Sequence, residues 1–368
     1  MIPNPRGRRG PQIIRYLPIL LAIVFFVVVG VRAGCQSASV LPEYDVGSEE
    51  LPAPEAAPPG EEAAKAREDT STDSDGNPRD TSSDNELRAH FIDVGQGDAI
   101  LLTAESANIL IDGGSRSAGD ALVDYLRKLG IERLDLVVAS HPHEDHIGGL
   151  LAVFEHFPVD TVLDAGVPHT TATFDRYLTR LERMVGEDGT QYLTPEGQTL
   201  RFGDVTVEVL GPRFAYDSLN DNSVVCRVGF RRTSFLFTGD MERETESDLL
   251  GSGENVEADV LKVSHHGSRS STSEEFLRGV SPAHAVICVG EDNSYGHPAD
   301  EVLERLSEYG VRVHRTDSSG TLLFISDGES ILSPDATRGT RSYEDIIARL
   351  KEWIGATIPT SLINPSRR

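Results

Sequence analysis

Ten consecutive residues, Ser140 to Gly149, constrain this chain more than any other stretch. They read SHPHEDHIGG and place three histidines and Asp145 within six residues. An apolar run at Leu134–Ala139 precedes them and predicts a buried strand, while the apolar pattern over residues 147–157 predicts a helix. The cluster therefore lies on the turn between the carboxyl end of a strand and a helix start. In α/β folds this rim is where ligands bind.

The side chains of this cluster are suited to metal ions. Imidazole is the commonest nitrogen ligand of zinc and similar cations, and carboxylates suit harder ions. His141 and His143 can face one ion, while Asp145 and His146 can face a second ion close by. The alternative is a polar surface loop without metal, but the H-x-H-x-D-H spacing is a more specific signal than a single histidine.

A second candidate ligand lies in Thr238-Gly239-Asp240, at the end of the strand expected over residues 234–237. A carboxylate at a strand end, just before a helix, can bridge two cations through its two oxygens. Taken alone, the tripeptide is a common turn. Together with the histidine cluster, it makes Asp240 a candidate bridging ligand.

Adjacent histidines in Ser264-His265-His266-Gly267-Ser268 follow the strand expected over residues 260–263. One histidine is enough to bind the second metal. The other is then left to bind a phosphate oxygen or to donate a proton. We favour His265 as the ligand and His266 as the group that faces the substrate, and the reverse assignment stays open.

Two further residues lie beside expected strand or helix ends. Asp112 ends a strand, so we interpret it as a carboxylate that orients a ligand histidine, although an aspartate in a plain strand-ending turn would look the same. His297 precedes an expected helix, whose N-terminus is a fair anion site. The alternative for His297 is a surface or capping group.

The first 35 residues predict a membrane-targeting segment. Four arginines lie at positions 6, 8, 9 and 15, and residues 17–31 are apolar. The run is short for a full membrane span, but the basic flank predicts an N-terminus inside the cell and an exported remainder, held at the cell membrane. An uncleaved single-pass anchor, a cleaved signal peptide that gives a secreted form, and a lipoprotein attached through Cys35 are the three possible fates.

Residues 36–86 are rich in Pro, Ala, Glu, Ser and Asp and have little to bury, which predicts a disordered tether. The whole chain of 368 residues carries a net charge of −25. Such a charge opposes a global electrostatic grip on nucleic acid. It leaves room for a local one, because bound metal ions would add positive charge where a phosphate would lie.

Residues 87–332 carry a mixture of expected strands and helices, which two sheets with helices outside them would explain. Residues 333–368 carry a further helical pattern at 343–354. We expect that helix to dock on the domain, with a partner-binding or membrane-surface helix as the alternative. The expected elements are strands 88–94, 99–103, 108–112, 134–139, 161–163, 205–210, 223–230, 234–237, 260–263, 285–289, 311–315 and 322–326 and helices 118–129, 147–157, 173–185, 242–250, 273–280 and 300–309.

The motifs named above, taken in their order along the chain, form one pattern. They resemble the metallo-β-lactamase-fold hydrolases and, more closely, the extracellular metallo-β-lactamase-like domain of ComEC-type DNA-uptake competence proteins. The resemblance spans residues 87–326 and is carried by residues 91–99, 141–146, 238–240, 259–268, 293–298 and 315–317.

The resemblance implies an α/β (α+β) fold, a four-layer αββα sandwich. It also implies one or two divalent ions, Zn or Mn, and a phosphodiesterase or nuclease that cuts a DNA strand outside the membrane, beside competence or uptake machinery. The predicted metal ligands are His141, His143, Asp145, His146, Asp240 and His265. The predicted catalytic residues are Asp145, His266 and His297, and the predicted surrounding or substrate-loop residues are Asp93, Asp98, Asp112, Asn220, Asn222 and Ser268.

Two departures from the family pattern matter. ComEC-type proteins carry a polytopic channel, whereas this chain has one apolar segment, so we do not expect it to move DNA by itself. Enzymes of this fold also usually have a further histidine about twenty residues before the bridging aspartate, where this chain has Asn220-Asp221-Asn222-Ser223. An oxygen ligand there would favour harder ions such as Mn²⁺ and makes a one-metal enzyme conceivable.

The sequence thus predicts metal-assisted hydrolysis of a phosphodiester, with DNA as the favoured substrate. Two alternatives stay open. The same site could act on another ester, such as a phosphorylcholine ester or a lactone, since one fold hosts many activities. The chain could also be a non-catalytic surface module that keeps only the fold.

Overall fold

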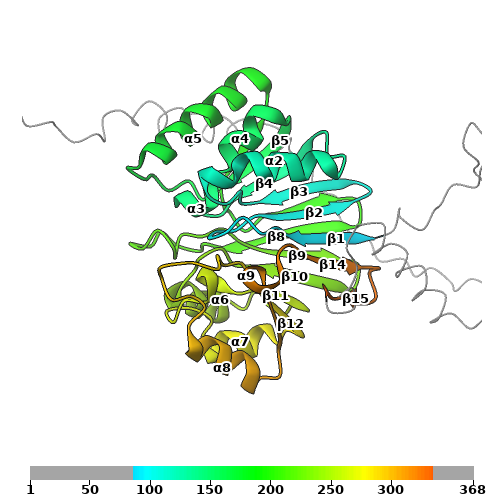
Figure 1. Ribbon diagram of the computed structural model, residues 1–368, viewed down its shortest axis with the longest axis vertical. Helices are drawn as coiled ribbons and strands as arrows, with labels where there is room; N and C mark the ends of the chain where they lie inside the picture. Colours follow the sequence, from blue (N-terminus) through cyan, green and yellow to red (C-terminus); the bar gives the residue numbers. More distant parts are fainter. Residues whose placement is uncertain (1–85, 335–368) are drawn as a thin grey trace, which may run out of the picture. The chain divides into compact units, whose positions relative to one another are not determined.

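The structure is a computed structural model that describes residues 86–334 (Figure 1). The predicted targeting segment, nearly all of the predicted tether and the predicted helix at 343–354 lie outside the described residues. Within the described part, no helix is both long and apolar enough to cross a bilayer. The expectations for both ends of the chain therefore stay predictions.

The first of two β-sheets holds the early strands of the domain together with its last two. Its neighbours in the middle, β3 and β4, run parallel, whereas β2 and β3 form an antiparallel hairpin. The sheet has eight strands in the order β15 (Ile331–Leu332), β14 (Leu322–Ser326), β1 (Leu87–Phe91), β2 (Ile100–Ala104), β3 (Ala107–Ile111), β4 (Leu134–Ala139), β5 (Val159–Asp164) and β6 (Gln191–Leu193).

The second sheet holds the later part of the domain. It combines an antiparallel half with a parallel half, which begins where β10 pairs with β11. Its seven strands lie in the order β13 (Arg312–Arg315), β12 (His284–Ile287), β11 (Val260–Lys262), β10 (Thr233–Phe237), β9 (Val225–Phe230), β8 (Val205–Gly211) and β7 (Thr199–Phe202).

Helices cover the outer face of each sheet, so that the domain has four layers (Figure 1). This arrangement confirms the predicted αββα sandwich. The first sheet is covered by α2 (Gly119–Lys128), α4 (Leu150–His156) and α5 (Ala172–Arg183), and the second by α6 (Arg243–Ser252), α7 (Glu274–Val280) and α8 (Asp300–Glu308). The shorter helical turns are η1 (Arg116–Ala118), α3 (Glu144–Ile147), η2 (Met184–Asp188), η3 (Ser264–Gly267) and α9 (Thr316–Ser319).

The alternation of strand side chains explains the layers. In β2, Ile100 and Leu102 point into the core between the sheets, while Leu101 packs toward the helices. In β10, Phe235 and Phe237 point between the sheets and stack on each other at 6.3 Å between ring centroids. Because successive side chains of a strand face opposite sides, strands buried on both faces must be apolar throughout, as these two largely are.

The helix predicted over residues 147–157 begins three residues later in the structure, as α4 at Leu150, and Ile147 instead ends the short helix α3. The break between the two helices falls at two glycines that lie against the loop after β3. A Cβ atom on Gly149 would lie 2.0 Å from the carbonyl oxygen of Gly113. Only glycine lets the chain pass this close to the loop after β3. The short helix α3 therefore carries the end of the histidine motif, and α4 begins after the two glycines.

Three short strands, β6, β7 and β15, were not predicted. They are two to four residues long and lie at sheet ends. Edge strands of this length show too little alternation to be recognised from the sequence.

Strand direction determines where the motifs meet. The loops after β3 and β4 leave the same edge of the first sheet because these strands are parallel, and the same holds for β10, β11 and β12 in the second sheet. The two edges are joined directly, since the backbone N–H of Val224 donates to the carbonyl oxygen of Ser140 at 2.8 Å. Ligands far apart in the sequence therefore gather at one rim of the sandwich.

Phe324→Ala tests the core between the sheets. The Phe324 ring is fully buried and packs edge to face on Phe91, 5.6 Å between centroids. We expect the free energy of unfolding to fall by about 3–5 kcal/mol in urea unfolding, because the change leaves a cavity. The control, Phe214→Ala, removes a ring that is 65% exposed and should change it by less than about 0.5 kcal/mol. Equal losses would contradict the described core.

Candidate metal centre

Asp112 holds the first-sheet side of the site together. It follows β3 with a positive φ of 58° and is fully buried. Its Oδ1 accepts a hydrogen bond from the backbone N–H of Ser140 at 2.8 Å, and its Oδ2 accepts one from Ser140 Oγ at 2.7 Å. His146 Nδ1 also lies 2.8 Å from that Oδ2. Because an ionised carboxylate can only accept, His146 donates through Nδ1 and points Nε2 away from Asp112.

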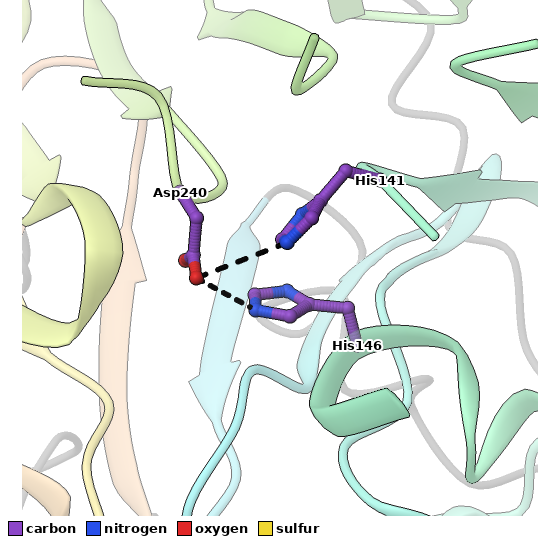
Figure 2. Close-up of side chains that lie close together, drawn as sticks. All are labelled: His141, His146 and Asp240. Carbon is purple, nitrogen blue, oxygen red and sulfur yellow. Dashed lines mark ion pairs between the residues drawn. The ribbon is translucent and has the colours of Figure 1, made fainter. Parts of the chain in front are cut away.

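Asp240 is the point where the two sheets' histidines meet. Its Oδ2 lies 3.2 Å from His146 Nε2 and 3.3 Å from His266 Nε2. His141 Nε2 lies 3.9 Å from the same oxygen (Figure 2), and His265 Nε2 lies 3.8 Å from it. Four imidazoles thus surround one buried carboxylate oxygen. Such a set of nitrogen and oxygen atoms is the chemistry of a zinc or manganese site.

Several atoms at this point have no hydrogen-bond partner among the described residues, although they are buried. They include Nε2 of His146, Nε2 of His266 and Oδ1 of Asp240. A buried polar atom without a partner is costly and needs an explanation, such as an ion. The orphaned ring nitrogens of His146 and His266 both face Oδ2 of Asp240, so the residues fit a divalent metal.

The possible ligands form overlapping sets of three, in which one ligand atom from each residue lies within 4.8 Å of the others. Because the sets share His146, Asp240 and His266, they describe one connected centre rather than separate sites. The sets are His141, His146 and Asp240; Asp145, His146 and His266; Asp98, Asp240 and His266; and Asp98, Asp112 and His146.

The kinked turn η3 distinguishes the two adjacent histidines. His265 and His266 both have positive φ angles, 48° and 52°, which turn their rings in different directions. His266 is buried, donates through Nδ1 to the carbonyl oxygen of Cys288 at 2.8 Å, and places Nε2 3.4 Å from Asp145 Oδ2. His265 has 22% of its side chain exposed, with Nδ1 3.1 Å from Glu242 Oε1. The structure therefore brings His266, and not His265, into the ligand sets, the reverse of the assignment we favoured from sequence.

A match to known proteins agrees with this geometry. The model of the family described as "Metallo-beta-lactamase superfamily" matches residues 92–291, which hold every residue of the ligand sets. The chain belongs to this superfamily. It is therefore a metallo-hydrolase by fold and by the composition of its buried centre.

The more similar relatives of this metallo-beta-lactamase domain are competence proteins, as the motifs predicted. ComE operon protein 3 of Bacillus subtilis (strain 168) is 32% identical over 254 residues, which cover 64% of this chain and 32% of that protein. Competence protein ComA of Neisseria gonorrhoeae is 32% identical over 245 residues, 66% of this chain and 32% of that protein. The chain thus spans about a third of the length of these relatives.

Among solved structures, the metallo-beta-lactamase fold protein YhfI from Bacillus subtilis is 15% identical, with a TM-score of 0.42, and the match covers 65% of this chain and 99% of that one.

The expected superfamily histidine before Asp240 has no direct counterpart here. Asn220 takes its place in the sequence, but its Nδ2 lies 3.5 Å from His265 Nδ1. A remote residue lies nearer the first ligands: the His169 ring is 5.7 Å from the His143 ring, which in turn has Nδ1 2.9 Å from His141 Nε2. Neither His143 nor His169 is in the ligand sets. The fold nevertheless places His169 beside His143, although the two residues are far apart along the chain.

The other predicted surrounding residues have different roles. Asn222 shapes its own loop by donating to the carbonyl oxygens of Tyr216 and Ser218. Asp93 Oδ1 accepts from the backbone N–H of Gly95 at 3.1 Å, so it closes a turn in the loop that leads to Asp98. Ser268 reaches the centre indirectly: its Oγ lies 2.9 Å from Ser270 Oγ, which donates to Glu242 Oε1 at 2.6 Å.

Lys262 is a member of the site that our sequence reasoning missed. It is the last residue of β11 and is 1% exposed. Its Nζ forms an ion pair with Asp98 Oδ2 and donates to the carbonyl oxygen of Gly239 at 2.8 Å. Burial acts to lower the pKa of Lys262, but the carboxylates of Asp98 and Asp240 raise it above the ordinary value. The residue sits in an apolar stretch, and its sequence context gave no signal of this contact.

Burial and charge oppose each other in the rest of the centre. Burial acts to raise the pKa of Asp240, but His146 and His266 lower it well below its ordinary value. Conversely, burial acts to lower the pKa of His266, while Asp240 and Asp98 raise it well above the ordinary value. Burial likewise acts to lower the pKa of His146, but Asp240 raises it, whereas burial and the neighbouring His146 hold the pKa of His141 well below its ordinary value. Without metal, positive charge is therefore favoured on His146 and His266 but not on His141. A metal ion that binds these nitrogens must release their protons, so affinity falls as pH falls.

Metal content separates the two adjacent histidines. His266→Ala removes a buried ring nitrogen from two ligand sets, and we expect it to bind at least one metal ion fewer per chain than the wild type. His265→Ala is the matched control and should keep its metal. Both variants are dialysed against the same metal solution and measured by elemental analysis. Loss of metal in His265→Ala alone would restore the assignment favoured from sequence.

Proposed function

We propose that this metallo-hydrolase is a metal-dependent phosphodiesterase, a nuclease that cleaves DNA, and that an N-terminal segment tethers it outside the cell membrane. The observation that carries the activity is the crowding of four imidazole nitrogens around Oδ2 of Asp240, within 3.9 Å. The competence proteins among the relatives support DNA as the substrate and uptake machinery as the partner.

The described residues would hold one or two ions, Zn or Mn. His141, His146 and Asp240 offer one set of ligands, and Asp145 and His266 extend it toward a second ion. His143, beside His141, would complete the first ion's surroundings. A bound divalent ion supplies a water molecule of lowered pKa and a Lewis acid for the phosphoryl oxygen.

His265 and His297 are the groups we assign to the substrate. His265 donates its Nδ1–H to Glu242, and its ring lies 5.5 Å from the ring of His297. His297 Nδ1 has no hydrogen-bond partner among the described residues. These two imidazoles would bind the phosphate and pass a proton to the leaving oxygen. His265 thereby takes the role that the sequence suggested for His266, while His297 keeps its predicted role and Asp145 acts through the metal.

An exposed aromatic ring beside these histidines favours a nucleic-acid substrate. Tyr295 is 68% exposed, and its ring stacks on His297 at 5.8 Å with an interplanar angle of 26°. Large exposed rings next to a phosphate-binding site serve as platforms for unpaired bases. The preferred substrate in this proposal is therefore a single strand.

A surface pocket of about 580 Å³ adjoins the centre through Glu242, which both lines it and holds His265. Three arginines line it, Arg243, Arg269 and Arg305, but four carboxylates line it as well, those of Asp221, Glu242, Glu244 and Glu301. Guanidinium groups bind phosphate through paired N–H donors. A strand that leaves the metal centre would meet these arginines singly, in a pocket whose lining has no net positive charge.

Cleavage assays on the full chain in detergent test the activity. Substrates are single-stranded DNA, duplex DNA and bis-p-nitrophenyl phosphate, each with Mn²⁺ or Zn²⁺. We expect hydrolysis with a preference for the single strand. Asp240→Asn keeps the shape and removes the charge, so cleavage should fall by orders of magnitude. Tyr295→Ala should slow cleavage of the single strand roughly tenfold, by loss of stacking, whereas the control Tyr295→Phe should not.

Three results would contradict the proposal. Hydrolysis of a phosphorylcholine ester or a lactone without DNA cleavage would assign the site to another ester. An unchanged rate in Asp240→Asn would place the active site elsewhere. No hydrolysis by a metal-loaded chain would leave a non-catalytic module.

The location outside the membrane is a separate part of the proposal, based on the arginines before residues 17–31. Protease added to intact cells, or to cells with a permeabilised outer membrane, should digest the domain. Cys35→Ser should alter membrane attachment and gel mobility only if the chain is a lipoprotein. Protection in spheroplasts would show the opposite orientation.

A further inference from the structure

A buried ammonium group lies on the carboxylate side of the metal centre. The side chain of Lys262 is 1% exposed, so it cannot touch a substrate. Its Nζ has three neighbours that attract a positive charge: Asp98 Oδ2 in a direct ion pair, the carbonyl oxygen of Gly239 at 2.8 Å, and Asp240 Oδ1 at 3.6 Å. Asp98 and the carbonyl of Gly239 accept two of the three N–H groups of the ammonium, whereas Asp240 Oδ1 lies beyond hydrogen-bond distance and attracts the charge only.

The position of Nζ coincides with one of the ligand sets. Asp98, Asp240 and His266 lie close enough together to hold a cation, and Lys262 contacts both carboxylates of that set. The contacts also divide the two oxygens of Asp240. Oδ2 faces the imidazoles, and Oδ1 faces Lys262.

We propose that Lys262 is a built-in cation of this centre. It holds Asp98 and Asp240 in place in the metal-free protein, directs Oδ2 of Asp240 to the metal, and excludes a further metal ion from the set of Asp98, Asp240 and His266. It is a positioning residue. The inference rests on the proposed metal centre but not on the proposed DNA substrate.

The charges explain why such a cation is needed. Asp98 and Asp240 are 1% and 3% exposed, so water screens their repulsion poorly. Removing one partner of a buried ion pair leaves an uncompensated charge, which destabilises a protein far more than removing both partners. A metal ion is able to replace the missing charge, but a neutral side chain is not.

The experiment compares Lys262→Met, Asp98→Asn and the double variant of the full chain, each with and without Mn²⁺. Methionine keeps an unbranched chain and removes the charge. Metal-free Lys262→Met should melt roughly 10 °C below the wild type. Saturating Mn²⁺ should raise its melting temperature more than that of the wild type, and elemental analysis should find one additional ion per chain. The double variant should melt above Lys262→Met when metal-free, because no buried charge is left unpaired.

Asp98→Asn keeps the test informative if Lys262→Met does not fold. It removes the main partner of Lys262, whose charge then acts on Asp240 alone. The Mn²⁺ concentration that gives half of the thermal shift should therefore rise several-fold. The proposal is overturned if metal-free Lys262→Met is as stable as the wild type, if its response to Mn²⁺ is no larger, if the double variant is no more stable than Lys262→Met, or if Asp98→Asn binds Mn²⁺ as tightly as the wild type. DNA cleavage enters none of these readouts, so a failure here is distinct from a failure of the nuclease proposal.

Discussion

The structure depends on the cost of burying the carboxylate of Asp240 at the junction of two sheets. A buried anion must be matched by nearby positive charge or hydrogen-bond donors. Here the imidazoles of His146 and His266 provide it on one side and the ammonium of Lys262 on the other. Each of these partners is itself fixed by another contact: His146 by Asp112, His266 by the carbonyl oxygen of Cys288, and Lys262 by Asp98. The metal binding proposed for this protein depends on that balance of charge around Asp240.

The sandwich brings these partners together through strand direction. Parallel neighbours in each sheet send their following loops to the same rim, and the core between the sheets holds the two rims at a fixed distance. Asp240 and Gly239 follow β10, whereas Lys262 ends β11, so that the parallel pairing of these strands brings the ammonium beside the carboxylate. The residues of the outer helices contribute little to the ligand sets. They bury the outer faces of the sheets and leave the rim to the loops.

Much of the fold and part of the site could be predicted from the sequence. The run Leu134–Ala139 was predicted to the residue, because its apolar pattern is continuous and its end is marked by the histidine cluster. The order of His265 and His266 could not be predicted, because it depends on two positive φ angles and on the carbonyl oxygen of Cys288, just after β12. Lys262 was missed for a similar reason, since its partner Asp98 lies on the other sheet's loop. Local chemistry is thus readable, whereas side-chain direction depends on the tertiary fold.

Three of the four ligand sets combine residues from the loops of both sheets, since each contains Asp240 or His266 together with Asp98, Asp145 or His146. A chain that has been synthesised only as far as His146 therefore has five of the seven residues of the four sets and lacks Asp240 and His266. Docking of the sheets must come before such a set exists, and the hydrogen bond from Val224 to Ser140 forms at the same junction. Metal capture by these sets is consequently a late event in folding, and the bound ion marks a chain whose two halves have assembled correctly.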